Sequence, residues 1–176
     1  MPTGIDVNKV DWLGATPLYL AANKDYAGIV ELLLSVSYID VRKSEKDEFT
    51  FLCWAVEKGY AEIVEQLLAV PGIDVNKVTF DGFTPLACAV HEGRTECVKL
   101  LLSAPGIDVN KVDDYGRTPL LSIVDEGNTE IIKLLLAAPG IDVNKADYDG
   151  NTPLYLAKRF GHKEIVKLLK AAGARK

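Results

Sequence analysis

The chain has 176 residues, of which 48% are hydrophobic and 26% charged, a balance typical of one or two globular domains. It holds no apolar run near the ~20 residues that a membrane-spanning helix needs, and its start lacks the features of a signal peptide, so we expect a soluble, cytoplasmic protein. The net charge of −5 argues against nucleic acid as a partner, and Cys53, Cys88 and Cys97 have neither zinc-ligand spacing nor the even number of a disulfide framework.

Two short sequence words recur at a fixed interval of 34 residues. The first word is Ile-Asp-Val-Asn-Lys, with one arginine variant, and its copies begin at Ile5, Ile39, Ile73, Ile107 and Ile141. The second word is Thr-Pro-Leu, with one phenylalanine variant, and its copies begin at Thr16, Thr50, Thr84, Thr118 and Thr152. A fixed period of this length indicates stacked helical units, none of which buries its apolar face alone. We therefore predict that residues 1–176 form one all-α repeat domain, a solenoid.

In chain order, residues 1–10 match the tail of a unit without its helices, and residues 11–44 form the first complete unit. This unit keeps the apolar residues of the repeat pattern: Leu20, Ile29, Val30, Leu32, Leu33 and Leu34. We expect an apolar outer side, because no preceding helix pair is present to cover it. Further repeats before this unit, or a second copy of the chain in a weak dimer, are two open explanations.

The second unit, residues 45–78, departs furthest from the pattern. It has Glu48 where the other units have glycine, and Phe51 where they have proline. Glycine permits the positive φ that a tight turn needs, so we expect a hairpin of different shape here. Drift and a functional change both remain open as reasons. Residues 79–112 return to the common pattern.

The fourth unit, residues 113–146, shows the local signals most clearly. Thr118 is placed to cap a short first helix, and Pro119 suits the first turn, where its missing N–H costs nothing. Gly127 predicts the end of that helix, since glycine favours the left-handed cap. A second helix with a broad apolar face is predicted to begin at Thr129 and to end before a proline-glycine pair.

The last unit, residues 147–176, reads as a cap with a polar outer face. Residues 156–176 hold seven basic residues and one acidic residue, a net +6, whereas residues 1–155 carry −11. In this unit Lys170 replaces a leucine that the earlier units have at Leu34, Leu68, Leu102 and Leu136. We therefore expect a basic end on an acidic body.

The Asp-x-x-Gly-x-Thr-Pro-Leu pattern, the glycine between two helices and the leucine-rich second helix resemble the ankyrin repeat family, whose usual period is 33 residues. The resemblance implies a stack of helix-turn-helix units joined by hairpin loops. It also implies a scaffold that binds another protein, rather than an enzyme. The close likeness of the junctions between units would also suit an engineered or reconstructed array.

Ankyrin repeats bind partners through their hairpin tips and the concave face of their first helices. The matching hairpin positions are Trp12, Leu13, Phe49, Phe80, Phe83, Tyr115, Arg117 and Tyr148. The matching positions on the first helices are charged or ionisable: Glu57, His91, Asp125 and Arg159. Exposed aromatic residues are typical of interface hot spots. Two other interpretations stay open: each ring covers the neighbouring hairpin, and the charges form an ordinary solvated face.

Catalysis is the alternative function. Cys53, His91 and Asp125 can be drawn as a hydrolase-like nucleophile, base and orienting acid in the concave groove. Repeat spacing separates these groups, however, and a triad needs heavy atoms within about 3 Å of one another. We therefore favour a buried cysteine and a surface histidine. No phosphate loop or dinucleotide fingerprint occurs, so we predict no catalytic residues, no cofactor and no metal.

Overall fold

A computed structural model describes residues 4–43 and 51–175 of the chain. Over these residues the secondary structure consists of ten α-helices and the turns between them, which confirms the all-α prediction. The helices are α1 (Pro17–Asn23), α2 (Ala27–Leu34), α3 (Phe51–Lys58), α4 (Ala61–Leu68), α5 (Pro85–His91), α6 (Thr95–Leu102), α7 (Pro119–Ile123), α8 (Thr129–Ala137), α9 (Pro153–Arg159) and α10 (Lys163–Ala171).

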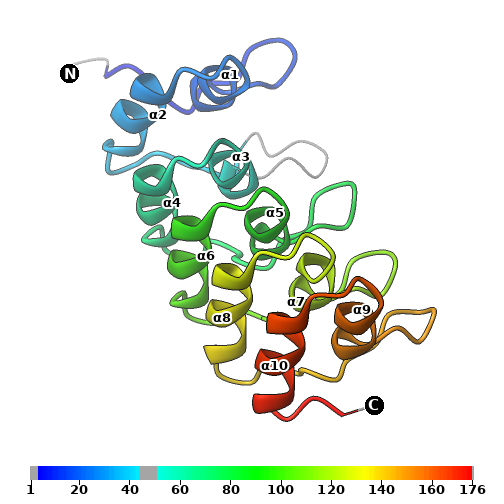
Figure 1. Cartoon of the computed structure of the whole chain (residues 1–176). Coiled ribbons are helices and arrows are strands. Elements are labelled where there is room, and N and C mark those ends of the chain that lie inside the picture. The colour runs from blue at the N-terminus through cyan, green and yellow to red at the C-terminus, as the bar shows by residue number, and fades with distance from the viewer. Residues whose placement is uncertain (1–3, 44–50, 176) are drawn as a thin grey trace.

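The helices form two rows that run along the stack (Figure 1). The odd-numbered helices make one row and the even-numbered helices the other, and each helix packs on its partner and on the next helix of its own row. The hairpins project from the odd-numbered row, along one edge of the molecule (Figure 1). A continuous core fills the space between the rows, with fully buried side chains such as Leu86, Leu101, Leu120 and Ile132. Units that share one core in this way are the architecture that the 34-residue period predicts.

The Thr-Pro-Leu word begins an odd-numbered helix, as predicted. The Thr118 hydroxyl oxygen accepts a hydrogen bond from the Leu121 backbone N–H at 3.1 Å, and Pro119 occupies the first turn. The same cap is made by Thr16, Thr84 and Thr152. Each threonine satisfies an N–H group that the helix itself leaves without a partner.

The end of α7 differs from the prediction. The helix ends at Ile123, and a run of turns leads from there to Gly127, which has a φ of 75°. The left-handed conformation is therefore at the predicted residue, but the helix stops before it. In the first unit the equivalent residue is Asp25, which adopts the same conformation with a φ of 62°. Asparagine and aspartate tolerate this region better than most other residues do.

The asparagine of the Ile-Asp-Val-Asn-Lys word connects successive units. Asn110 Nδ2 donates to the Gly140 carbonyl at 2.7 Å, and its Oδ1 accepts from the Asp142 N–H at 2.8 Å. The equivalent bonds of Asn8 and Asn76 reach the unit that follows each of them. We call these paired bonds the asparagine rungs. Between the first and second units the position is occupied by arginine, Arg42.

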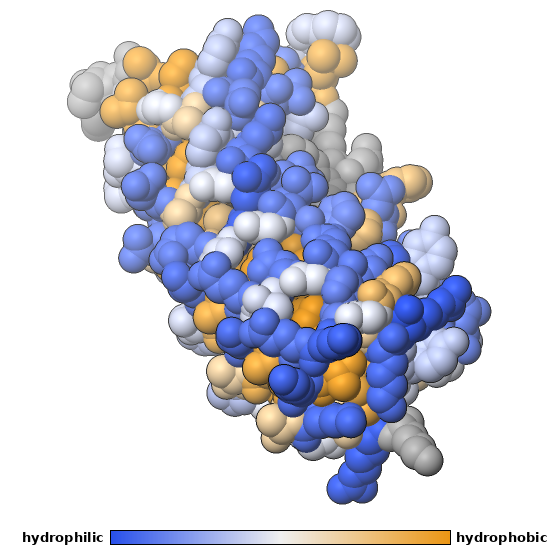
Figure 2. All heavy atoms as spheres, in the orientation of Figure 1, coloured by the Kyte–Doolittle hydropathy of each residue, from blue (hydrophilic) through white to orange (hydrophobic). Residues whose placement is uncertain are grey.

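The outer side of the first unit is apolar only in part. Leu20, Ile29 and Leu32 are exposed there, at 40%, 48% and 71%. Val30 is buried, and Leu33 and Leu34 of α2 pack against the core, so three of the six apolar residues named above make up this outer side. Apolar atoms gather at the upper left of Figure 2, over this end of the stack.

Two further observations concern the second unit and the helix lengths. Its hairpin candidates Glu48 and Phe49 lie outside the described residues, so the predicted change of hairpin shape stays a prediction. Its first helix begins directly at Phe51, which is buried. In the part of the chain that the structure describes, every helix is too short or too polar to cross a membrane.

Candidate functional site

Of the predicted hairpin residues that the structure describes, five are exposed to solvent. The exposed fractions are 90% for Trp12, 54% for Leu13, 81% for Phe80, 68% for Tyr115 and 76% for Tyr148. The hairpins that carry them project from the same row of helices, along one edge of the stack (Figure 1). Large aromatic side chains are the type enriched in interface hot spots. We call these five residues the hairpin tips.

Phe83 is placed differently from the other predicted hairpin residues. Phe83 follows the turn glycine Gly82, and its carbonyl accepts from the Thr79 N–H at 2.9 Å, which closes the hairpin. Its side chain points back to the stack, where it packs against the core and stacks on the His91 ring with centroids 6.0 Å apart. The equivalent candidate of the second unit, Phe49, lies outside the described residues.

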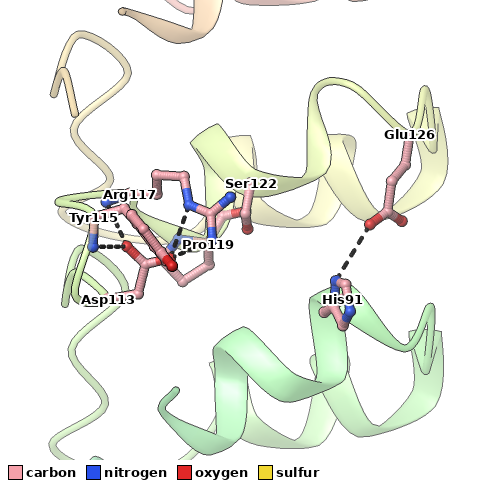
Figure 3. A network of polar contacts seen from close by, with 7 residues as sticks. All are labelled: His91, Asp113, Tyr115, Arg117, Pro119, Ser122 and Glu126. Carbon is pink, nitrogen blue, oxygen red and sulfur yellow. Dashed lines mark hydrogen bonds and ion pairs between the residues drawn. The ribbon is translucent and has the colours of Figure 1, made fainter. Parts of the chain in front are cut away.

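Arg117 is held by its own hairpin. Its Nε and Nη2 atoms both lie 2.8 Å from Asp113 Oδ2, and its guanidinium lies 4.9 Å from the centroid of the Tyr115 ring (Figure 3). The other oxygen of Asp113 accepts from the backbone N–H groups of Tyr115 and Arg117. The side chain of Asp113 is 4% exposed. Arg117 therefore braces the hairpin, and its charge is already matched within the chain.

A hollow of about 340 Å³ lies between the last two hairpins. Its walls come from these hairpins and its floor from α7 and α9. The Tyr148 N–H donates to the Tyr115 carbonyl at 3.2 Å. The Tyr148 ring packs on Gly116, where a Cβ atom would lie 2.6 Å from it. Tyr148 thus covers the neighbouring hairpin, as the alternative interpretation proposed, yet most of its surface remains exposed.

The four charged candidates of the concave face are all exposed: Glu57, His91, Asp125 and Arg159. They do not simply stack in a column. His91 Nδ1 lies 3.6 Å from Oε1 of Glu126 in the next unit (Figure 3). Glu126 follows Asp125, the residue of that unit that is equivalent to His91. The imidazole is therefore placed between a carboxylate and the ring of Phe83.

The middle of the concave face is acidic. Partial burial raises the pKa of Glu57 above its ordinary value of 4.5, and the nearby Glu92 carboxylate raises it further. Partial burial also raises the pKa of Glu126, with contributions in the same direction from Asp125 and Glu92 and an opposing one from His91. Carboxylates that disfavour one another's ionisation create a surface that a cation would stabilise.

The geometry does not support the hydrolase alternative. Cys53 is 2% exposed, and its thiol forms a hydrogen bond with the Cys88 thiol. The pKa of the Cys88 thiol is raised by this hydrogen bond and by burial. The imidazole of His91 lies against Glu126 and Phe83, as described above. Since a nucleophile must reach its substrate as a thiolate, two buried thiols fit a core position rather than a catalytic one.

The residue after the glycine between the helices of a unit connects that unit to the one before it. Arg94 Nε and Nη2 donate to the Glu57 carbonyl at 3.1 and 2.9 Å. At the equivalent position two units later, His162 Nε2 lies 3.1 Å from the Asp125 carbonyl. This connection was not predicted from the sequence, although a polar residue recurs at this point of each unit. These bonds hold the ends of the odd-numbered helices in place.

The hollow was not predicted from the sequence either. Asp114 and Asp149 line it from the hairpins, and Leu156 and Phe160 line it from α9 and the residue that follows. A signal was present, because the fourth and fifth hairpins each carry a tyrosine beside two aspartates. What the repeat pattern does not show is that side chains from two units converge on one space.

Comparison with known proteins agrees with the repeat architecture. The chain matches the family model for ankyrin repeats in three copies, over residues 1–79, 39–113 and 105–176. A similar solved structure is the crystal structure of an ankyrin repeat domain from Acinetobacter baumannii AYE. It is 32% identical, the match covers 98% of this chain and 88% of that one, and the TM-score is 0.86. A comparison with curated protein sequences gave no significant match.

Proposed function

The chain belongs to the ankyrin repeat family, and we propose that it is a scaffold that holds a partner protein against its hairpin tips and concave face. Ankyrin repeats generally bind other proteins. In this chain the contacts would come from the five hairpin tips and from the charged residues at the ends of the odd-numbered helices. The partner is another protein, because the acidic concave face would repel nucleic acid.

One observation carries the proposal. Trp12, Phe80, Tyr115 and Tyr148 are exposed by 68% or more, and they project from one edge of a rigid stack. Burying rings of this size against a partner releases a large apolar area from water. A rigid framework lowers the entropy that binding costs, because the contact residues are already in position.

Catalysis is not proposed. The family is typically non-catalytic, and the one cysteine that the sequence placed near a histidine has a buried thiol. Phe83 and Arg117 are also left out of the proposed contacts, because each is engaged within its own unit. His91, Glu57, Asp125 and Arg159 remain as candidates for polar contacts at the edge of the interface.

The test is an affinity capture with three immobilised proteins. The first is the wild-type chain, and the second carries Trp12→Ala, Leu13→Ala and Phe80→Ala. The third is a matched control that removes three exposed tyrosines away from the hairpins, by Tyr26→Ala, Tyr38→Ala and Tyr155→Ala.

A true partner is a protein retained by the wild type and the control and lost by the tip variant. With that partner purified, the tip variant should bind more weakly by several kcal/mol, as the loss of hot-spot residues does. Circular dichroism of the three proteins should agree, since the changed residues are exposed. Equal retention by the tip variant and the control would remove the hairpin tips from the interface.

A further inference from the structure

The hollow between the last two units combines three properties. Its floor is apolar, from Leu121, Leu156 and Phe160. Its walls include the rings of Tyr115 and Tyr148. Its remaining lining is largely carboxylate. The volume, about 340 Å³, is near the low end of the ~300–1,000 Å³ that is usual for ligand pockets. This space suits one long side chain better than a cofactor.

The charges in the hollow are unbalanced. Four carboxylates contribute to the lining: Asp114, Asp125, Asp147 and Asp149. Among the described residues of the lining, Arg117 alone is basic, and its guanidinium is held at 2.8 Å by Asp113, which lies outside the lining. The hollow therefore keeps its negative charge after the internal ion pair is counted.

Asp147 remains ionised. Partial desolvation raises its pKa, but hydrogen bonds from the Asn151 side chain and from the backbone N–H groups of Asn151 and Asp149 outweigh it, with help from Arg117, so the pKa lies below its ordinary value of 3.8. The Asn151 bonds measure 2.8 Å from the backbone and 2.9 Å from the side chain. A carboxylate fixed in this way contributes a permanent negative charge to the hollow.

The occupant must match both the charge and the apolar floor. Among the described residues, no group of three or more histidine, cysteine, aspartate or glutamate side chains is arranged to hold a metal ion. A small inorganic cation would also leave Leu121, Leu156 and the two tyrosine rings unused. A guanidinium fits better, because it stacks on aromatic faces, pairs with carboxylates through several N–H groups and carries an aliphatic stem.

We propose that the hollow between the fourth and fifth units binds an arginine side chain of the partner protein. The stem lies on Leu121, Leu156 and Phe160, the guanidinium stacks on the exposed face of the Tyr148 ring, and Asp125 and Asp149 accept its hydrogen bonds. This inference rests on the proposed function and adds to it the chemistry of the segment that the partner presents. It also explains why an acidic concave face accompanies aromatic tips. The tips would bury apolar surface against the partner, and the acidic hollow would select a partner with a basic side chain.

The test is a nuclear magnetic resonance titration of the full-length chain with two blocked pentapeptides. One has a single central arginine between alanine and glycine residues. The other has citrulline, a neutral isostere, in its place. The arginine peptide should shift the signals of Tyr115, Tyr148 and Phe160, and the citrulline peptide should bind about tenfold more weakly, as loss of a charge-assisted pair predicts.

Two variants complete the test. The double variant Asp125→Asn, Asp149→Asn removes two exposed charges and should weaken the arginine peptide by about tenfold or more. Glu130→Gln removes one exposed carboxylate from the start of α8 and should change nothing. Equal binding of the two peptides, or shifts that lie outside the hollow, would overturn the inference.

A separate outcome distinguishes this inference from the proposed function. If a captured partner binds the double variant as tightly as the wild type but is lost by the hairpin-tip variant, the scaffold proposal stands and the arginine site fails. If the arginine peptide binds the hollow while capture shows no dependence on the hairpin tips, the arginine site stands and the tips are removed from the proposed function.

Discussion

The two ends of the stack present opposite faces to solvent. At the N-terminal end, Leu20, Ile29 and Leu32 are exposed on α1 and α2. At the C-terminal end, α10 buries Ile165 and Leu169 and exposes its lysines. Both faces occupy the same kind of position, at the outside of a helix pair that has a neighbour on one side only.

This difference teaches how a repeat array is closed. Lys170 occupies the position at which the inner units have a leucine packed against the core. This one difference replaces an apolar side chain with a charged one on the outer face of the last unit, as a terminal repeat requires. The first unit has no such change. Its α2 also has fewer buried residues, Val30 being the one that is fully enclosed. We therefore expect the N-terminal unit to be the less stable end of the stack.

The largest expected effect comes from equivalent leucines in two units. Leu101 of α6 is fully buried, and Leu101→Ala should lower the free energy of unfolding by about 2–5 kcal/mol. Leu33 occupies the equivalent position of α2, two units closer to the N-terminus, and is half-buried, so Leu33→Ala should cost much less. Urea unfolding followed by circular dichroism measures both.

The shape of the two curves sharpens this prediction. Leu101→Ala should shift the main transition, whereas Leu33→Ala should produce or enlarge an early transition of small amplitude, because each unit is stabilised by its neighbours. Equal losses of unfolding free energy in one shared transition would show that the stack unfolds as a single cooperative unit. The two ends would then not differ in stability.

The asparagine rungs supply the next effect. Asn110→Ala removes two hydrogen bonds to the following unit, at 2.7 and 2.8 Å, and should cost about 1–2 kcal/mol. At the junction of the first two units, Arg42→Asn should instead add about 1 kcal/mol by restoring the missing rung. Thermal unfolding of both variants gives the comparison.

A control separates the gain of asparagine from the loss of arginine. Arg42→Ala removes the same guanidinium without supplying an amide, so it should give no increase in melting temperature. If Arg42→Ala stabilises the chain as much as Arg42→Asn does, the effect belongs to the arginine, and the rung is not what the first junction lacks.

A weaker effect is expected on self-association. The exposed apolar residues of the first unit should bring two copies together at high concentration. The double variant Leu20→Lys, Ile29→Lys should then sediment as a monomer throughout a concentration series, while Tyr155→Lys at the opposite end should behave as the wild type does. A wild-type chain that is monomeric at every concentration would contradict this prediction.

The smallest effect concerns the acidic centre of the stack. A carboxyl whose pKa is higher in the folded chain than in the unfolded chain stabilises the fold most when protonated, and that contribution is lost as the pH rises through its folded-state pKa. Glu57 is such a group. Glu57→Gln should therefore raise the melting temperature slightly near neutral pH.

The same gain should disappear below the ordinary pKa of 4.5, where the wild-type carboxyl is itself protonated. Glu65→Gln on the exposed side of α4 serves as the matched control and should show no such dependence. A gain from Glu57→Gln that persists unchanged at low pH would mean that charge is not its cause.

Much of the fold follows from local signals in the sequence. The Thr118–Pro119 pair predicts where a helix begins, because capping depends on residues only three positions apart. The period predicts stacking, since every unit repeats the same apolar face. The end of α7 was less predictable, because the turns before Gly127 depend on packing with neighbouring helices.

The candidate site was predictable only in part. Phe83 and Phe80 lie three residues apart in one hairpin, yet one packs inward and the other is exposed, which depends on which arm of the turn each occupies. The hollow depends on side chains from two units, including Asp114 and Leu156, whose approach is a property of the stacked chain. The sequence of a single repeat therefore does not predict the hollow.

The asparagine rungs have a mechanical consequence. When the molecule is pulled along its stacking axis, the junctions between units carry the load in series, so the weakest one yields first. Asn76 and Asn110 fasten the later junctions with two bonds each, whereas the first junction has Arg42 in that place. Under tension the first unit should therefore unfold before the others, while the hollow between the fourth and fifth units stays intact.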